Sequence, residues 1–232
     1  MIVLIDAGNS NIKLASVSNV GDIERITINQ FYESISLVKK VIYASVNHSK
    51  SLQQILTECQ KNQIELQEVI TSKTFKNIHC GYENSQNLGV DRWLAIIGAR
   101  TAYKDDTLII VDAGTAITID VCNKEQHLGG WIVPGLTLMQ HSIIEKAPGV
   151  FSDQQIKNER LGSDTPSALF HGCLYSSIGL IEKANDFAKE KSKSTSKIIL
   201  TGGDAKLLSE YLTLPNDVNS DLVFMGLKQF IE

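Results

Sequence analysis

At 232 residues, the chain is long enough for one large domain or two modest ones, because single domains typically hold about 100–150 residues. Hydrophobic residues make up 43% of the sequence and charged residues 21%, which is typical of globular proteins and excludes disordered and collagen-like chains. The 22 basic and 26 acidic side chains give a formal net charge of −4 without a long basic block, so we expect no nucleic-acid partner.

The cysteines and the uncharged stretches of the sequence indicate a cytoplasmic protein. Residues 128–144 and 165–181 are interrupted by glycine, proline and polar residues, and neither reaches the run of about 20 apolar residues that crosses a membrane. The N-terminal segment has no basic region and reaches an acid at Asp6, so it is interpreted as a strand and not as a secretory signal. We therefore expect a cytoplasmic protein with no membrane partner. The cysteines form no C-x-x-C pair, which favours reduced, buried thiols over disulfides or a zinc site, and they are Cys59, Cys80, Cys122 and Cys173.

The first third of the chain alternates short β-branched segments with turns. Its first three strands are expected to form an antiparallel meander, and the next strand, amphipathic helix and strand to form a β-α-β unit. A further helix ends at the charged turn 104–106, where we place a domain boundary. The predicted elements are strands at 2–5, 12–17, 23–28, 41–46 and 66–70, and helices at 51–61 and 90–103.

The pattern of the opening strand recurs about a hundred residues later in the sequence. In both places a β-branched strand runs into Asp-Ala-Gly, at residues 6–8 and again at residues 112–114. The sequence therefore predicts an internally duplicated α/β protein with domains at 1–104 and 105–232. The remaining predicted elements are helices at 136–146, 166–191, 206–211 and 222–231, a strand at 198–200, a solvated loop at 189–197, and a helix cap at Ser163 or Asp164.

The Asp-Ala-Gly turns have the chemistry of a nucleotide-phosphate site. A carboxylate at the end of a buried strand projects from the sheet edge, and the following glycine allows a tight turn whose N–H groups bind anions. A phosphate beside Asp6 or Asp112 requires a cation between them, so the turns predict a Mg²⁺-nucleotide. One such turn alone is equally a hairpin without ligand, but two matched copies favour two phosphate loops facing one cleft.

A third glycine turn, residues 201–204, follows a strand and opens a helix. Such a turn either approaches a nucleoside closely or simply starts the helix. The sequence has no P-loop, no G-x-G-x-x-G fingerprint and no protein-kinase catalytic loop.

Taken together in order, four segments resemble the type III pantothenate kinases, a family of the actin, Hsp70 and sugar-kinase superfamily. The resemblance implies duplicated RNase H-like (actin-like ATPase) domains with mixed sheets flanked by helices. It also implies ATP-dependent phosphorylation of pantothenate to 4′-phosphopantothenate, the first step of coenzyme A biosynthesis. The four segments are residues 6–13, 89–93, 111–118 and 129–135.

The resemblance assigns contacts with ATP, Mg²⁺ and a monovalent cation. Asp112 matches the ligand of the monovalent cation, K⁺ or NH₄⁺. Thr115 matches an ATP contact in the second turn, and Asp6 is placed to organise Mg²⁺-ATP. The first turn resembles a phosphate loop, which comprises Asp6, Ala7, Gly8, Asn9, Ser10, Asn11, Ile12 and Lys13.

The same resemblance assigns the pantothenate pocket. Tyr82 and Thr165 match pocket positions, and Asp91 lies at the position of the catalytic base. In the family a homodimer completes the pocket, which explains why Thr165 lies so far along the chain. The substrate-binding segment corresponds to Gly89, Val90, Asp91 and Arg92.

The pair formed by Asp91 and Arg92 suits this chemistry, because pantothenate offers a hydroxyl to be phosphorylated and a carboxylate to be recognised. A carboxylate accepts the hydroxyl proton, and a guanidinium binds the carboxylate or the transferring phosphoryl group. The alternative is an ordinary charged pair at the start of a helix. The family often has proline where this chain has Ser85, and its loss is expected to loosen the loop.

Two alternatives to this function remain open: a non-enzymatic transcriptional accessory protein, and a kinase for another small hydroxylated metabolite. The five histidines lack metal-ligand spacing and are interpreted as surface or core residues. Trp93 and Trp131 are interpreted as packing residues. The glycines of 129–135 either bring backbone close to substrate or make turns.

Overall fold

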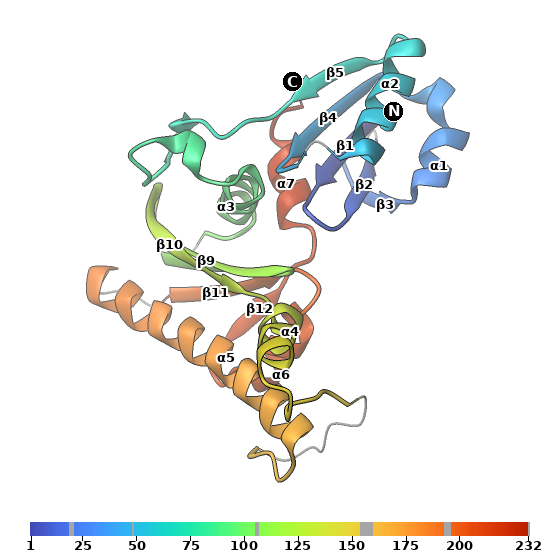
Figure 1. Ribbon diagram of the computed structural model, residues 1–232. Coiled ribbons are helices and arrows are strands. Elements are labelled where there is room, and N and C mark those ends of the chain that lie inside the picture. The colour runs from blue at the N-terminus through green and yellow to red at the C-terminus, as the bar shows by residue number, and fades with distance from the viewer. Residues whose placement is uncertain (19–20, 48, 105–106, 154–159, 193–195, 232) are drawn as a thin grey trace. The chain divides into compact units, whose positions relative to one another are not determined.

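The computed structural model describes residues 1–18, 21–47, 49–104, 107–153, 160–192 and 196–231 (Figure 1). Contacts divide the chain into two compact units. The first unit comprises Met1–Lys104, Glu125–His127 and Asp221–Glu232, and the second comprises Asp105–Lys124 and Leu128–Ser220. Within the described residues, no helix combines the length and the apolar character needed to cross a membrane.

The first unit contains a five-stranded sheet with the order β3-β2-β1-β4-β5. The first three strands form the expected antiparallel meander, and β1 pairs with β4 in parallel. Helix α2 connects β4 to the parallel strand β5, which confirms the β-α-β unit. The elements are β1 (Ile2–Ala7), β2 (Ile12–Val17), β3 (Ile23–Ile26), β4 (Lys40–Ser45), α2 (Lys50–Lys61) and β5 (Glu65–Glu68).

The strand expected at 23–28 is shorter, because a helix begins inside that range. Thr27 is the N-cap of α1 (Ile28–Glu33). The Gln30 N–H donates to Thr27 Oγ1 over 3.2 Å, and the Thr27 N–H donates to Gln30 Oε1 over 2.8 Å. This reciprocal capping box satisfies two backbone donors and ends the strand. A short 3₁₀ helix, η1 (Ile35–Leu37), follows α1.

Helix α3 (Val90–Ala102) packs against α7 (Leu222–Lys228), which ends earlier than the expected residue 231. The two helices lie side by side in Figure 1. A Cβ added at Gly98 would lie 2.0 Å from the Leu222 carbonyl oxygen, and one at Gly226 would lie 2.1 Å from the Leu94 oxygen. Glycine at both positions is therefore what permits this close packing.

The C-terminal helix α7 belongs to the first unit by its contacts, although it follows residue 104 in the sequence. Neither contact unit is therefore a continuous half of the chain. The division into domains 1–104 and 105–232 stays a prediction.

The second unit contains the sheet order β12-β11-β8-β9-β10. Strands β8 and β9 form an antiparallel hairpin, β11 pairs with β8 in parallel, and β12 pairs with β11 in parallel. Taken from β10 to β12, this order corresponds strand by strand to the order from β3 to β5 in the first unit, as expected for an internal duplication. The strands are β8 (Thr107–Ala113), β9 (Ala116–Asn123), β10 (Gln126–Pro134), β11 (Ser196–Thr201) and β12 (Asn216–Val218).

No strand was expected at β10, where the glycines of 129–135 were interpreted as a close approach to substrate or as turns. The first residues of β10 belong to the first unit. There Gln126 pairs in parallel with His79 of β7 (Ile78–His79), which in turn pairs with β6 (Thr74–Phe75). Gly129 has a φ of 118°, a conformation that L side chains rarely adopt. A glycine in a strand often marks such an irregularity and not the end of the strand.

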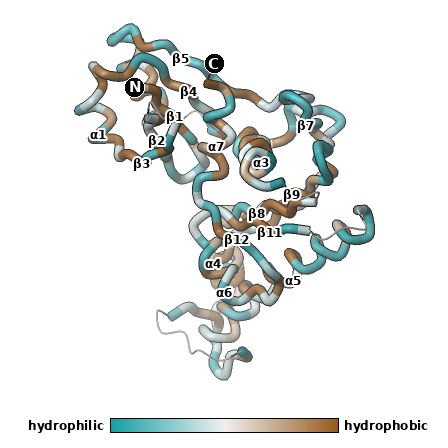
Figure 2. The backbone as a smooth tube through the Cα atoms, turned by 180° about the vertical axis from the view of Figure 1, so that it is seen from behind, coloured by the Kyte–Doolittle hydropathy of each residue, from teal (hydrophilic) through white to brown (hydrophobic). Residues whose placement is uncertain are grey.

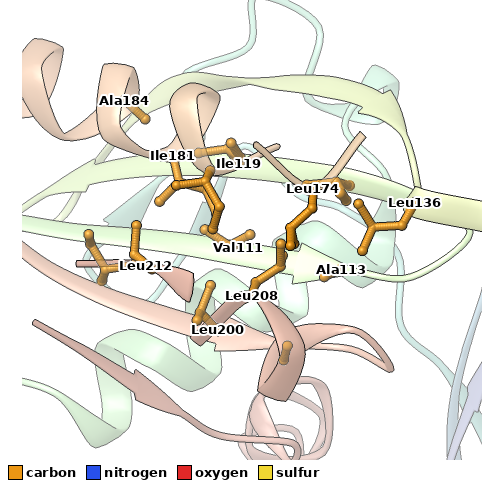
Figure 3. Close-up of a cluster of buried hydrophobic side chains, with 14 of the residues drawn as sticks. Val111, Ala113, Ile119, Leu136, Leu174, Ile181, Ala184, Leu200, Leu208 and Leu212 are labelled. Atoms are coloured by element: carbon orange, nitrogen blue, oxygen red, sulfur yellow. The ribbon is translucent and has the colours of Figure 1, made fainter. Parts of the chain in front are cut away.

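Side chains from strands β8, β9 and β11 and from helices α4, α5 and α6 form the core of the second unit (Figure 3). Leu174, Ile181 and Leu208 are fully buried, and residues 108–111 of β8 are hydrophobic (Figure 2). The helices are α4 (Leu136–Lys146), α5 (Thr165–Ser192) and α6 (Ala205–Tyr211).

Helix α5 agrees with the helix expected at 166–191 and therefore includes the first residues of the loop expected at 189–197. Buried Ala188 keeps the apolar face of this helix in the core until its last turn. Residues 193–195 of that loop lie outside the described residues, and β11 begins at Ser196. The expected cap is Asp164, whose Oδ1 accepts the Ser167 N–H over 2.9 Å. All four cysteines are free and buried, as expected.

The contact between α3 and α7 predicts a large effect of a single methyl group. Gly98→Ala drives its Cβ into backbone oxygen that cannot move alone, so it should destabilise the protein by at least about 2 kcal/mol. Gly179→Ala in α5 is the matched control, because a Cβ there meets nothing within 4 Å. The control should be neutral or stabilising by up to about 1 kcal/mol in urea unfolding. Equal stability of the two variants would contradict this packing.

Candidate functional site

The first Asp-Ala-Gly turn joins β1 to β2. Ala7 pairs with Ile12 at its base, and Asp6 pairs across the strands with Lys13. The Gly8 N–H closes the turn by donating to the Asn11 carbonyl over 3.0 Å. The side chains at the tip of the turn, Asn9, Ser10 and Asn11, are exposed. The strand pairing thus leaves a short polar loop directly beside a carboxylate.

Asp6 is a buried acid with one cation across the hairpin. Only 11% of its side chain is exposed, and its Oδ2 lies 4.0 Å from Lys13 Nζ. Burial raises the pKa of Asp6, the positive charge of Lys13 opposes that shift, and the negative charge of Asp91 adds to it. The site therefore destabilises an ionised Asp6 and favours a further cation beside it.

Asp91 lies in the first turn of α3, where the helix N-terminus favours negative charge. Its Oδ1 accepts the N–H of the next residue, Arg92, over 2.8 Å. A Cβ added at Gly89 would lie 2.6 Å from that same oxygen, so glycine there lets the carboxylate fold back over the helix start. Val90, the first residue of α3, is half-buried. Asp91 and the first turn belong to the same unit, and the negative charge of Asp91 contributes to the raised pKa of Asp6.

The Arg92 guanidinium is buried and held against Tyr82. Arg92 is 5% exposed, and its Nη1 donates to the Tyr82 hydroxyl over 3.0 Å. The guanidinium carbon lies 5.7 Å from the centre of the Tyr82 ring. Two of the residues that the sequence assigned to substrate binding are therefore in direct contact.

The loop between Tyr82 and α3 is fixed by hydrogen bonds. Lys73 Nζ donates to the Tyr82 carbonyl over 2.7 Å, and Thr71 Oγ1 donates to the Leu88 carbonyl over 2.8 Å. Ser85, where proline was expected, opens the 3₁₀ helix η2 (Ser85–Asn87), and the Leu88 N–H donates to the Ser85 carbonyl over 3.0 Å. These bonds supply a constraint of the kind that proline would have given.

His127 completes this cluster and was not singled out from the sequence. It is fully buried at the start of β10, its Nδ1 accepts the Gly81 N–H over 3.3 Å, and its ring stacks on Tyr82. Its position depends on the long-range pairing of β10 with β7, for which no local pattern gives a signal. Within the described residues, no three His, Cys, Asp or Glu side chains group as metal ligands.

The second Asp-Ala-Gly turn joins β8 to β9 and differs from the first in one important residue. Asp112 pairs across the strands with Thr118, where Asp6 has Lys13. The Gly114 N–H donates to the Ala116 carbonyl over 3.0 Å, and Thr115 is exposed at the tip. The second hairpin thus presents a carboxylate with no lysine at the paired position.

Backbone from two other segments packs closely on this second turn. The Gly135 N–H donates to the Thr115 carbonyl over 2.9 Å, and a Cβ at Gly135 would lie 2.1 Å from the Gly114 oxygen. Gly202 has a φ of 93°, and a Cβ there would lie 2.5 Å from Asp112 Oδ1. The turn at 201–204 therefore lies against the Asp112 turn, and the Asp204 N–H donates to the Ala113 carbonyl over 3.0 Å.

Burial raises the pKa of Asp204 in this turn. Gly135 is the N-cap residue of α4, and its backbone packs against the second turn. Its approach to a substrate stays a prediction. Thr165, the first residue of α5, is exposed in the second unit, whereas the other expected pocket residues lie in the first.

The family model for type III pantothenate kinases matches residues 2–186. The chain belongs to this family. It is a kinase that phosphorylates pantothenate with ATP and a divalent metal ion in coenzyme A biosynthesis, as the sequence resemblance predicted.

Curated members of the family are similar over nearly the whole chain. A type III pantothenate kinase from Pseudoalteromonas translucida is 39% identical over 212 residues, which cover 90% of this chain and 88% of the relative. One from Pseudoalteromonas atlantica is 32% identical over 241 residues, which cover 99% and 96%.

Solved structures show the same fold. A Campylobacter jejuni protein, named provisionally as a Baf family transcriptional activator, is 27% identical with a TM-score of 0.65, covering 99% of this chain and 96% of its own. A Sinorhizobium meliloti protein, named provisionally as a 2-dehydro-3-deoxygalactonokinase, is 10% identical with a TM-score of 0.53, covering 99% and 97%. The second likeness concerns the fold alone. The α/β architecture of duplicated, actin-like domains is thereby confirmed.

The raised pKa of Asp6 predicts that this residue costs stability. Burial disfavours the ionised form of Asp6 in the folded protein only, so Asp6→Asn should raise the melting temperature at pH 7 by a few degrees. The gain should decline with falling pH and vanish below the pKa of an aspartate in the unfolded chain, about 3.9, because the carboxyl is then neutral in both states. Asp217→Asn, which removes only a partly exposed ion pair with Lys197, is the control and should change little. A melting temperature lowered by Asp6→Asn would show that the Lys13 pair outweighs burial.

Proposed function

We propose that Asp91 is the catalytic base that accepts the proton of the pantothenate hydroxyl. The observation that supports this proposal is the position of Asp91 in the first turn of α3, directly before the buried Arg92 that binds Tyr82, in the same unit as the first phosphate turn. Phosphoryl transfer is largely dissociative, so the base has to orient the hydroxyl and accept its proton late. Its hydrogen bond from the Arg92 N–H, over 2.8 Å, fixes the carboxylate for this task.

The first turn is proposed to bind the phosphates of ATP. Asp6 suits the divalent cation, because a buried carboxylate that resists ionisation gains most from a positive ion beside it. The bound Mg²⁺ supplies charge neutralisation for the transferring phosphoryl group. Lys13 adds a second positive charge, while Ala7 and Ile12 pair at the base of the turn and shape it. The tip consists of half-buried Gly8 and the exposed residues Asn9, Ser10 and Asn11.

The second turn is proposed to bind ATP through Thr115 and a monovalent cation, K⁺ or NH₄⁺, through Asp112. The contrast between the two hairpins supports this division. Lys13 provides a fixed cation opposite Asp6, whereas the residue paired with Asp112 is the neutral Thr118. The carbonyl oxygen of Ala113 adds to an oxygen-rich environment of the kind that hard cations prefer.

The pantothenate pocket is proposed to combine both protomers of a homodimer. In one protomer, Gly89, Val90 and Asp91 form the start of α3, and Arg92 with Tyr82 recognises the carboxylate or the phosphoryl group. Thr165 would then come from the partner chain, which is consistent with its exposure at the start of α5 in the other unit. The four free, buried cysteines support a cytoplasmic location.

The role of Asp91 is tested by Asp91→Asn, which keeps the shape of the side chain and removes the base. We expect kcat for pantothenate phosphorylation to fall by about 10²–10⁴. Binding of pantothenate, measured by calorimetry, should change much less. A rate close to that of the wild type would reduce Asp91 to a positioning residue.

The shared pocket is tested by mixing two inactive variants, Asp91→Asn and Thr165→Arg, as co-expressed chains. In a mixed dimer one pocket receives the intact Asp91 of one chain and the intact Thr165 of the other. Up to about a quarter of the wild-type activity should therefore return. A chain that carries both substitutions is the control and should stay inactive. If mixed dimers form without recovery of activity, the pocket is completed within one chain.

A further inference from the structure

His127 is held in the first unit by backbone pairing and not by its own neighbours in sequence. Strand β10 begins with Gln126 paired to His79 of β7, and the His79 N–H donates to the Glu125 carbonyl over 2.8 Å. The imidazole is fully buried, although it lies between exposed Gln126 and exposed Leu128. A buried polar ring at such a place requires partners for its nitrogens.

The ring of His127 contacts the segment that leads into Tyr82. Its Nδ1 accepts the Gly81 N–H over 3.3 Å. Its plane lies 17° from that of the Tyr82 ring, with the ring centroids 6.0 Å apart.

Tyr82 is consequently held from both sides. Its hydroxyl accepts a hydrogen bond from Arg92 Nη1 over 3.0 Å, and His127 stacks on its ring. Lys73 Nζ binds its backbone carbonyl over 2.7 Å. The described contacts form a chain from His127 through Tyr82 to the buried guanidinium of Arg92.

We propose that His127 is a positioning residue for pantothenate, which acts through Tyr82 on the orientation of the Arg92 guanidinium. This inference rests on the proposed role of Tyr82 and Arg92 in substrate binding. A guanidinium recognises a carboxylate through a planar, two-pronged geometry, so a small rotation of Arg92 weakens binding. Loss of the imidazole frees the Tyr82 ring to rotate and leaves the Gly81 N–H without its acceptor.

The first experiment measures steady-state kinetics of His127→Ala against the wild type. The KM for pantothenate should rise about tenfold, while kcat and the KM for ATP stay within about twofold. His79→Ala is the matched control, because this histidine lies on the paired strand with an exposed side chain. A parallel fall in kcat, ATP affinity and melting temperature would show a merely structural role and overturn the proposal.

Two conservative variants test the proposal if His127→Ala fails to fold. His127→Asn retains an acceptor for the Gly81 N–H without the ring, and His127→Phe retains the ring without the acceptor. Each should restore part of the pantothenate affinity. A KM as high as that of His127→Ala in both folded variants would contradict the two contacts on which the proposal depends.

A double-mutant cycle separates this proposal from the proposed function. Tyr82→Ala alone should raise the KM for pantothenate, and adding His127→Ala should raise it no further, because His127 acts through Tyr82. If the double variant instead shows the product of the two single effects on KM, His127 does not act through Tyr82 and the proposal is overturned. If Tyr82→Ala leaves the KM unchanged, the proposed substrate role of Tyr82 fails as well. If Tyr82→Ala raises the KM and His127→Ala does not, the inference about His127 fails alone.

Discussion

A carboxylate placed at the end of a buried strand is the constraint on which the rest of the structure depends. Burial raises the pKa of Asp6, and Lys13, 4.0 Å away and half-exposed, offsets that effect only in part. A buried, ionised carboxylate is unfavourable for folding. It is retained where a positive ion and an anionic ligand bind beside it. The glycine that follows lets the backbone turn beside the carboxylate, so phosphate and cation fit at one place. In the proposed function, the location of phosphoryl transfer follows from this one buried charge.

The internal duplication gives the chain two copies of the Asp-Gly hairpin, to which we assign different ligands. Both sheets continue from the Asp-Gly hairpin into two parallel strands, in the same order. The cross-strand partner of the aspartate differs, since it is Lys13 in the first hairpin and Thr118 in the second. The second turn is also packed by Gly135 and Gly202, whose missing side chains let neighbouring backbone approach it. The same topology thus gives one turn with a lysine opposite its aspartate and one with a threonine there, which is the difference on which the proposed monovalent-cation site at Asp112 rests.

Local patterns in the sequence predicted the parts of the fold that depend on local physics. The β-branched strands, helix α2 and the duplicated turns are visible because periodicity and turn residues are properties of neighbouring residues. Strand β10 was missed because Gly129, Gly130 and Pro134 are typical of turns, whereas pairing with strands distant in sequence makes that segment extended. The placement of α7 beside α3 was missed for the same reason, since the complementarity of Gly98 and Gly226 exists only in three dimensions. His127 had no metal or catalytic spacing, and the role proposed for it rests on its contact with Tyr82, which only the folded chain makes.

The most direct test of the account is a crystal structure of the protein with Mg²⁺, a non-hydrolysable ATP analogue and Tl⁺, whose anomalous scattering marks monovalent-cation sites. The account predicts that the analogue's phosphates contact both turns, residues 8–11 and 114–115. It also predicts Mg²⁺ on the Asp6 side and Tl⁺ at Asp112. A nucleotide bound at one turn only, or Tl⁺ located away from Asp112, would contradict the claim that the two duplicated carboxylates share one nucleotide.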